Sequence, residues 1–288
     1  MEDCFVKRKN LGLYVCNRLP QLVKGMIWTP DNFVIPAGEE QTLATWQDAI
    51  FAPMDRIFYW PPFVKIEMLS TEAVYEDTPL SFIPVLDGQY RFRGHIRQNM
   101  CTHKNMFSHR GASGRVFLVD ILNQVLGTRA ENGDFMGVKL ALLHTEKFAW
   151  SDGSTGTTSP VYVALEDAHE IDQYGDIIEG KFLKSLIRIV DVAFTKISAS
   201  ATDIVVDIKV DCDGTPVVGL IAADFILYEP DGSTVHAITG VVESASVPGR
   251  YTITGTGIVT GSLLTLQTAD ELSLNGYEMP EPFVVVIP

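Results

Sequence analysis

Three groups of residues have the types and spacing that metal binding or acid–base chemistry needs. The first is Cys101, His103 and His109, which lie close together and are the residue types that bind Zn²⁺. A closed tetrahedral site needs four donors, and the neighbouring sequence offers no obvious fourth. We therefore expect ordinary polar or core residues here.

The second group, Asp211, Asp213 and Gly214, resembles the start of a calcium-binding loop. An EF-hand needs glycine at its sixth position and a bidentate acid at its twelfth, where this chain has Pro216 and Ala222. The pattern therefore favours a β-turn.

The third group is an acidic stretch around one histidine. Its members are Glu166, Asp167, His169, Glu170 and Asp172. Paired carboxylates can act as general acid and base, but acids this dense in a loop are more often a solvated face. As an alternative, this stretch receives a basic patch on a neighbouring subunit. The complement is the basic stretch 91–115, which contains Arg91, Arg93, Arg97, Lys104 and Arg110.

Catalytic and nucleotide-binding motifs are missing from the sequence. It contains no GxxxxGK[ST], GxSxG, HExxH or GxGxxG pattern. We therefore predict that the protein is not an enzyme and has no cofactor or metal.

Composition and charge exclude further classes of protein. The chain has 288 residues, of which 46% are apolar and 20% charged, and its net charge is −14. This is the composition of a globular protein, and its charge disfavours binding nucleic acid through phosphates. There is no apolar run of membrane-spanning length, and residues 1–9 lack the apolar core of a secretion signal. The four cysteines are scattered, so we expect free thiols and assembly inside a cell, without a membrane.

Charge also divides the chain. Residues 198–288 contain two cations and twelve acids, and a short run of small polar residues, 198–202, precedes all of them. We place a domain boundary there, giving domains 1–197 and 198–288.

Most elements read as strands. The C-terminal domain has β-branched or alternating runs at 204–210, 225–228, 234–238, 250–254, 263–267 and 283–287, and 229–233 is a hairpin turn. These predict a β-sandwich. The N-terminal domain has one helix, at 42–51, and strands at 64–68, 90–96, 116–120, 125–128, 138–143 and 159–165. We therefore predict a mainly β protein whose first domain resembles a sandwich or barrel.

Part of the second domain resembles a known family. The segments DGTPVVGL (213–220), 225–232 and PGRYT (248–252) are similar to bacterial and phage immunoglobulin-like domains. The resemblance implies an immunoglobulin-like β-sandwich and names no ligand.

An apolar aromatic run, 58–63, contains Trp60 and is punctuated by prolines. Exposed aromatic area usually marks an interface, so we predict a homo-oligomer. The candidate interface residues are Arg91, Arg93, Arg97, Arg110, Glu166, Asp167, Glu170 and Trp60.

This organisation resembles the major tail (tail tube) protein of long-tailed phages, and segments 88–128 and 161–167 are similar to phage structural proteins. The resemblance implies a virion protein that is assembled in the host cytoplasm. Its first domain would stack with copies of itself into hexameric rings, which contact other virion proteins, and its second would decorate the outside. DNA would pass through the channel without specific binding. The alternatives are a head decoration, neck or baseplate protein, or a carbohydrate-binding or carbohydrate-active protein with an accessory immunoglobulin-like module.

Overall fold

The computed structural model describes residues 22–52, 55–72, 74–78, 81–86, 88–151, 153, 156–186, 188–266, 276–279 and 281–287. The protein is mainly β, with 45% strand and 14% helix, which confirms the predicted fold class. No helix within these residues is long and apolar enough to span a membrane.

The chain forms two compact units, Met1–Leu186 and Ile187–Pro288. This division lies eleven residues before the predicted boundary between 197 and 198. The reason is β13 (Val190–Ala199), which crosses that boundary and pairs along its length with β14 (Asp203–Val210). The small polar residues read as a linker are the hairpin turn between these two strands, where Ser200 N–H donates to Asp203 O (2.8 Å).

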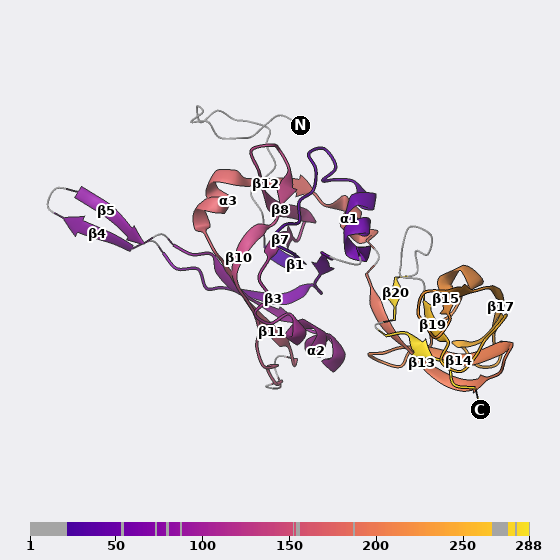
Figure 1. Ribbon diagram of the computed structural model, residues 1–288. Coiled ribbons are helices and arrows are strands. Elements are labelled where there is room, and N and C mark those ends of the chain that lie inside the picture. Colours follow the sequence, from indigo (N-terminus) through magenta and orange to yellow (C-terminus); the bar gives the residue numbers. More distant parts are fainter. Residues whose placement is uncertain are drawn as a thin grey trace. The chain divides into compact units, whose positions relative to one another are not determined.

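Unit 1 is built on a ten-stranded, half-barrel-like sheet (Figure 1). Its main path runs β12-β8-β7-β10-β11-β6-β3; β1 pairs with β7 and β2, and β9 pairs with β8. The strands are β1 (Val23–Thr29), β2 (Phe58–Tyr59), β3 (Phe63–Met68), β6 (Arg91–Ile96), β7 (Arg115–Asp120), β8 (Gln124–Arg129), β9 (Phe135–Met136), β10 (Val138–Thr145), β11 (Ser159–Leu165) and β12 (Gly175–Glu179).

The central strand β7 is covered on both faces, because its residues 116–120 are all buried. On one side Phe117 meets Trp46 of α1 (Leu43–Phe51), with ring centroids 5.1 Å apart. Trp46 in turn stacks on Phe182 of the 3₁₀-helix η1 (Lys181–Lys184) at 5.1 Å. The apolar spacing that predicts a helix at 42–51 is thus explained by its packing on the sheet.

Two further α-helices lie among the described residues, α2 (Met100–Ser108) and α3 (Ala168–Tyr174). The prediction of a single helix was therefore wrong. Both helices are short, α2 buries only Met106, and α3 buries no residue. Neither has the periodic apolar stripe from which a helix is read in a sequence.

The edge strand β3 and its neighbour β6 continue into a two-stranded ribbon. Their ladder runs through the Thr71–Gln89 bridge into β4 (Val74–Thr78) and β5 (Ser81–Leu86), which pair only with each other (Figure 1). The neighbouring strand β11 pairs with β6 only as far as Arg91. At about 3.3 Å per residue, the five residues of β4 span roughly 16 Å, and no third described strand pairs with β4 or β5. We call this segment the β4–β5 ribbon.

Unit 2 is a two-sheet β-sandwich, as predicted. One sheet has the order β17-β18-β14-β13-β20 and the other β16-β15-β19-β21. The remaining elements are β15 (Phe225–Tyr228), β16 (Val235–His236), β17 (Ile238–Glu243), β18 (Arg250–Gly255), β19 (Leu263–Leu266), β20 (Tyr277–Glu278), β21 (Phe283–Val284) and the 3₁₀-helix η2 (Ala222–Asp224). The inward residues of both sheets form one core, which includes Ile204, Leu227 and Tyr251.

Candidate functional site

The acidic stretch lies on and before α3, and its central carboxylate is neutralised within the chain. Glu170 Oε1 forms an ion pair with Arg115 Nη1 at 2.7 Å, and both side chains are only 18% exposed. Glu170 Oε2 accepts a hydrogen bond from the Lys139 backbone N–H (2.9 Å). The basic stretch and the acidic stretch therefore do pair, through Arg115 and Glu170 of one chain, and the pair ties α3 to the sheet.

The other acids of this stretch also face their own chain. Glu166 pairs with Lys139 Nζ at 2.9 Å, and Asp167 caps α3 by accepting from His169 N–H (2.8 Å). Tyr90 donates its hydroxyl to Asp172 (3.1 Å). Burial and the Asp172 charge raise the pKa of Tyr90. These contacts give the stretch a role in folding, and its pairing with a neighbouring subunit stays a prediction.

The predicted basic residues are divided between paired and unpaired groups. Arg93 pairs with Glu67 (3.5 Å) and Glu146 (3.1 Å), and Arg91 donates to the side chain of Gln89 (2.6 Å). Arg97, by contrast, has no ion pair with the residues that the structure describes.

The side chain of Arg110 is exposed and makes no ion pair with the described residues. It donates to His144 Nδ1 (3.1 Å) and lies over the ring of Phe107, 5.3 Å from its centroid. Lys104 lies on α2, which ends two residues before Arg110, and makes no ion pair with any described residue. The exposed positive charge of the stretch 91–115 is thus concentrated around α2.

Trp60 does not lie at the surface. Its side chain is 3% exposed and belongs to the core of unit 1. Its backbone N–H donates to Met26 O (3.0 Å), which holds the aromatic run against β1. The expectation that this tryptophan is an exposed interface residue is therefore wrong, because pairing with β1 turns its ring inward.

The three zinc candidates do not converge. His103 Nδ1 lies 2.9 Å from Ser159 Oγ, whereas His109 is packed among the rings of Trp28, Phe58 and Trp60 at 4.5–5.9 Å. Burial lowers the pKa of His109. The described residues contain no cluster of three or more metal-binding side chains.

The two described cysteines, Cys101 and Cys212, are both disulfide-bonded, which corrects the expectation of free thiols. Cys4 and Cys16 lie outside the described residues. The calcium-like segment is a turn in which Asp213 Oδ1 accepts from Thr215 N–H (2.9 Å), and this hydrogen bond lowers the pKa of Asp213.

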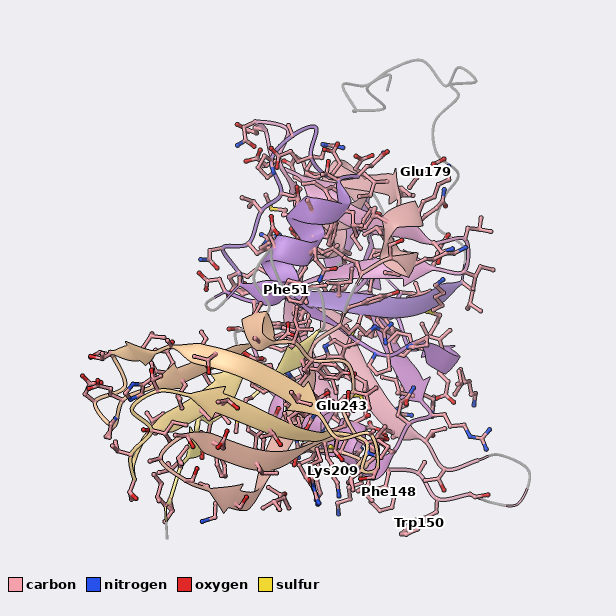
Figure 2. The ribbon with its side chains drawn as sticks, turned by 90° about the vertical axis from the view of Figure 1, so that its right-hand side faces the viewer. Phe51, Phe148, Trp150, Glu179, Lys209 and Glu243 are labelled. Atoms are coloured by element: carbon pink, nitrogen blue, oxygen red, sulfur yellow. The ribbon has the colours of Figure 1, made fainter. Side chains whose placement is uncertain are left out.

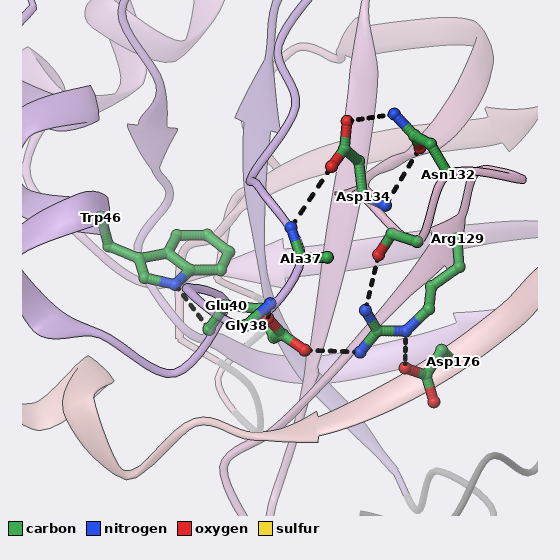
Figure 3. Close-up of polar contacts among 9 residues, drawn as sticks. Ala37, Gly38, Glu40, Trp46, Arg129, Asn132, Asp134 and Asp176 are labelled. Atoms are coloured by element: carbon green, nitrogen blue, oxygen red, sulfur yellow. Dashed lines mark hydrogen bonds and ion pairs between the residues drawn. The ribbon is translucent and has the colours of Figure 1, made fainter.

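A buried ion-pair network that sequence reasoning missed centres on Arg129 (Figure 3). Its guanidinium contacts Glu40 (2.7 Å) and Asp176 (2.6 Å) and donates to Gly133 O (2.8 Å). Glu40 is 9% exposed, and its backbone carbonyl accepts from Trp46 Nε1 (2.9 Å). No sequence motif predicts this network, because its members are distant from one another in the sequence. It anchors the loop before α1 to the sheet.

A second missed feature is an aromatic strip beside α2. The ring centroids of Phe107 and His103 are 6.3 Å apart, those of His103 and Phe148 5.6 Å, and those of Phe148 and Trp150 4.7 Å. Figure 2 labels Phe148 and Trp150 close together at one end of unit 1. Trp150 is 77% exposed and Phe107 42%. An exposed tryptophan in a loop is visible in the sequence, but its alignment with α2 requires the fold.

No family model and no curated protein matches this chain.

Proposed function

We propose that this protein is a structural subunit of a tailed-phage virion, most simply the tail tube protein, which assembles with copies of itself into stacked, hexameric rings. In this proposal the protein catalyses no reaction and is located in the virion after assembly in the host cytoplasm. Unit 1 forms the ring around the DNA channel, and unit 2 is an immunoglobulin-like decoration on the outside.

The observation that supports self-assembly best is the β4–β5 ribbon. A two-stranded hairpin is marginally stable in water unless a third strand or another surface covers it. Its outer edges also carry unpaired N–H and C=O groups, which can pair with another chain. Within the described residues, β4 and β5 have no partner strand besides each other. A second copy of unit 1 would supply the missing surface.

The charge of the chain supports the role of DNA as passing cargo. A net charge of −14 gives the protein a field that repels phosphates over the surface as a whole. DNA would therefore move through a ring of such subunits without being held by it.

The test uses the full-length protein and a variant whose ribbon is shortened by joining residues 71 and 89 through an Asn-Gly turn. We expect the wild type to form rings or tubes in negative-stain microscopy, and the shortened variant to sediment as a folded monomer. Leu122→Ser is the control, since it removes an exposed apolar side chain of unit 1 (52% exposed) away from the ribbon.

Two results would refute the proposal. One is a wild type that stays monomeric at high concentration. The other is a shortened variant that assembles as well as the wild type. Near-UV circular dichroism verifies that the variant is folded.

A further inference from the structure

We propose that the exposed surface around α2 binds the acidic turns of unit 2 of a second copy of this chain. The inference rests on the proposed self-assembly and adds a second contact, distinct from the β4–β5 ribbon. We call this region the α2 surface; it consists of Arg97, Lys104, Phe107, Arg110, Lys147 and Trp150.

The apolar part of the α2 surface has the composition of a protein interface. The aromatic strip from Phe107 through His103 and Phe148 to Trp150 connects α2 with the segment after β10. Tryptophan, phenylalanine and arginine are enriched where proteins meet, and tryptophan and arginine contribute most of the binding energy there. An exposed strip of this kind is costly to leave in water.

The charge of this region opposes that of the rest of the chain. Residues 88–119 contain six cations and no acid, whereas the whole chain has a net charge of −14. Lys104 and Lys147 make no ion pair with the described residues. The guanidinium of Arg97 lies against Gly156, which brings it to the same loop that follows Trp150. Among the described residues of its own unit, no carboxylate pairs with these cations, so the surface carries exposed positive charge.

Unit 2 supplies the complementary charge. Residues 187–288 contain thirteen acids and four cations. Several described carboxylates face only hydroxyl groups, backbone N–H groups or solvent; they are Asp203, Asp211, Asp213, Glu229, Asp231 and Glu243.

Four of these acids lie on two turns. Asp211 and Asp213 follow β14, and Glu229 and Asp231 follow β15. Hydrogen bonds from the Ser233 and Thr234 backbones lower the pKa of Asp231 to about 2, so this turn stays charged at every physiological pH. Opposite charges on two copies of one chain give a head-to-tail contact, which closes into rings or extends into stacks.

A protein partner fits this surface better than a nucleic acid does. A nucleic acid would be repelled by the large negative charge of the chain, because its phosphates extend well beyond the α2 surface. A turn of a second copy presents only a small number of carboxylates, which fits the limited extent of the positive charge on the α2 surface.

The test is a charge exchange between two full-length variants. Lys104→Glu/Arg110→Glu reverses the α2 surface, and Asp211→Lys/Glu229→Lys reverses the two turns. Asp211 and Glu229 are chosen because neither carboxylate holds its turn, unlike those of Asp213 and Asp231. Lys181→Glu is the matched control, a charge reversal at an 86% exposed lysine outside the α2 surface.

Each variant alone should associate roughly tenfold or more weakly than the wild type in sedimentation velocity, since like charges then face each other. An equimolar mixture of the two should regain wild-type association, because every contact between unlike copies is again between opposite charges. Trp150→Ser should weaken association in the same direction, and Lys181→Glu should not.

Each contrary result has a separate meaning. If both charge variants associate as strongly as the wild type, the α2 contact is overturned. The ribbon proposal stays intact in that case, provided that shortening the ribbon still abolishes assembly. Failure of the mixture to recover would overturn unit 2 as the partner. A third outcome would replace the proposal with a nucleic-acid site. In it, both variants assemble like the wild type, the wild type binds fluorescein-labelled dT20, and Lys104→Glu/Arg110→Glu abolishes that binding.

Discussion

Replacing Arg129 with methionine removes the centre of the buried network while keeping an apolar stem beside Phe135. The guanidinium lies 5.6 Å from the Phe135 ring centroid and contacts Glu40 and Asp176 at 2.7 and 2.6 Å. Methionine leaves both carboxylates without their cation. The energetic cost of losing the cation is larger for Glu40, because its side chain is 9% exposed, against 26% for Asp176.

The expected loss follows from this burial. Removing one partner of a buried ion pair costs about 3–5 kcal/mol, because the remaining charge is left desolvated. Since Asp176 and the Gly133 carbonyl can regain water, we expect the lower end, about 3 kcal/mol. For a unit of this size that corresponds to a fall in Tm of roughly 6–12 °C.

The loss should depend on pH. Burial raises the pKa of Glu40, but the hydrogen bonds from Arg129 and from backbone groups outweigh it, so the pKa lies below its ordinary value of 4.5. In the wild type this stabilisation is present above pH 4.5 and is lost as the pH falls through the folded-state pKa. Without Arg129, burial dominates and raises the pKa, so acidification relieves the buried charge. The difference between the two proteins should therefore shrink from pH 7 to pH 4.

Urea denaturation followed by tryptophan fluorescence measures this effect in unit 1, since all four tryptophans precede residue 187. Lys139→Met is the matched control: its ion pair with Glu166 has a similar length, 2.9 Å, but both side chains are about half exposed. This control should leave the urea midpoint unchanged. A loss in Arg129→Met below about 1 kcal/mol, or one that is the same at both pH values, would refute the reasoning.

Two further predictions concern single buried groups. Burial lowers the pKa of His109, so its unfolded form binds protons more readily and the stability of unit 1 should fall as the pH drops through 6.5. His109→Phe should reduce that slope between pH 7.5 and 5.5 in urea titrations, and an identical slope would contradict the assignment. Tyr251 is fully buried, donates to Val217 O (3.0 Å) and accepts from Leu220 N–H (3.2 Å). Tyr251→Phe should lower the stability of unit 2 by about 1–3 kcal/mol in calorimetry, whereas a neutral effect would show that water replaces the hydroxyl.

The strands and turns were largely predictable because their signals are local. The β-branched run 204–210 became β14 (Asp203–Val210), and the Pro-Asp-Gly turn joins β15 to β16 as expected. The hairpin after β7 turns at Asn123, whose φ of 61° suits an asparagine. Alternation along a strand and positive φ in a turn depend on a few neighbouring residues, and these are visible in any sequence.

The sites were less predictable, because the sequence does not show whether a charged or aromatic side chain points into the core or into solvent. Trp60 looks exposed in a proline-rich run, yet its pairing with β1 places it in the core. The run 198–202 looks like a linker, yet it turns the chain from β13 into β14. For Trp60 a strand more than 30 residues away decides burial, and nothing in the local composition specifies that strand. For the run 198–202, pairing of the strands on either side makes a turn out of residues that have the composition of a linker.

What the sequence determined by itself is therefore the class of fold, about half of the strands, several turns and the separation of charge between two units. Tertiary structure alone decided which charges meet. Arg115 and Glu170 are 55 positions apart, and Arg129 and Glu40 are 89 apart. From the sequence, the carboxylates of the acidic stretch could pair with a neighbouring subunit. In the fold, the sheet places Arg115 beside Glu170 and Lys139 beside Glu166. The strength of an ion pair depends on distance and on exclusion of water, and both are properties of the folded chain.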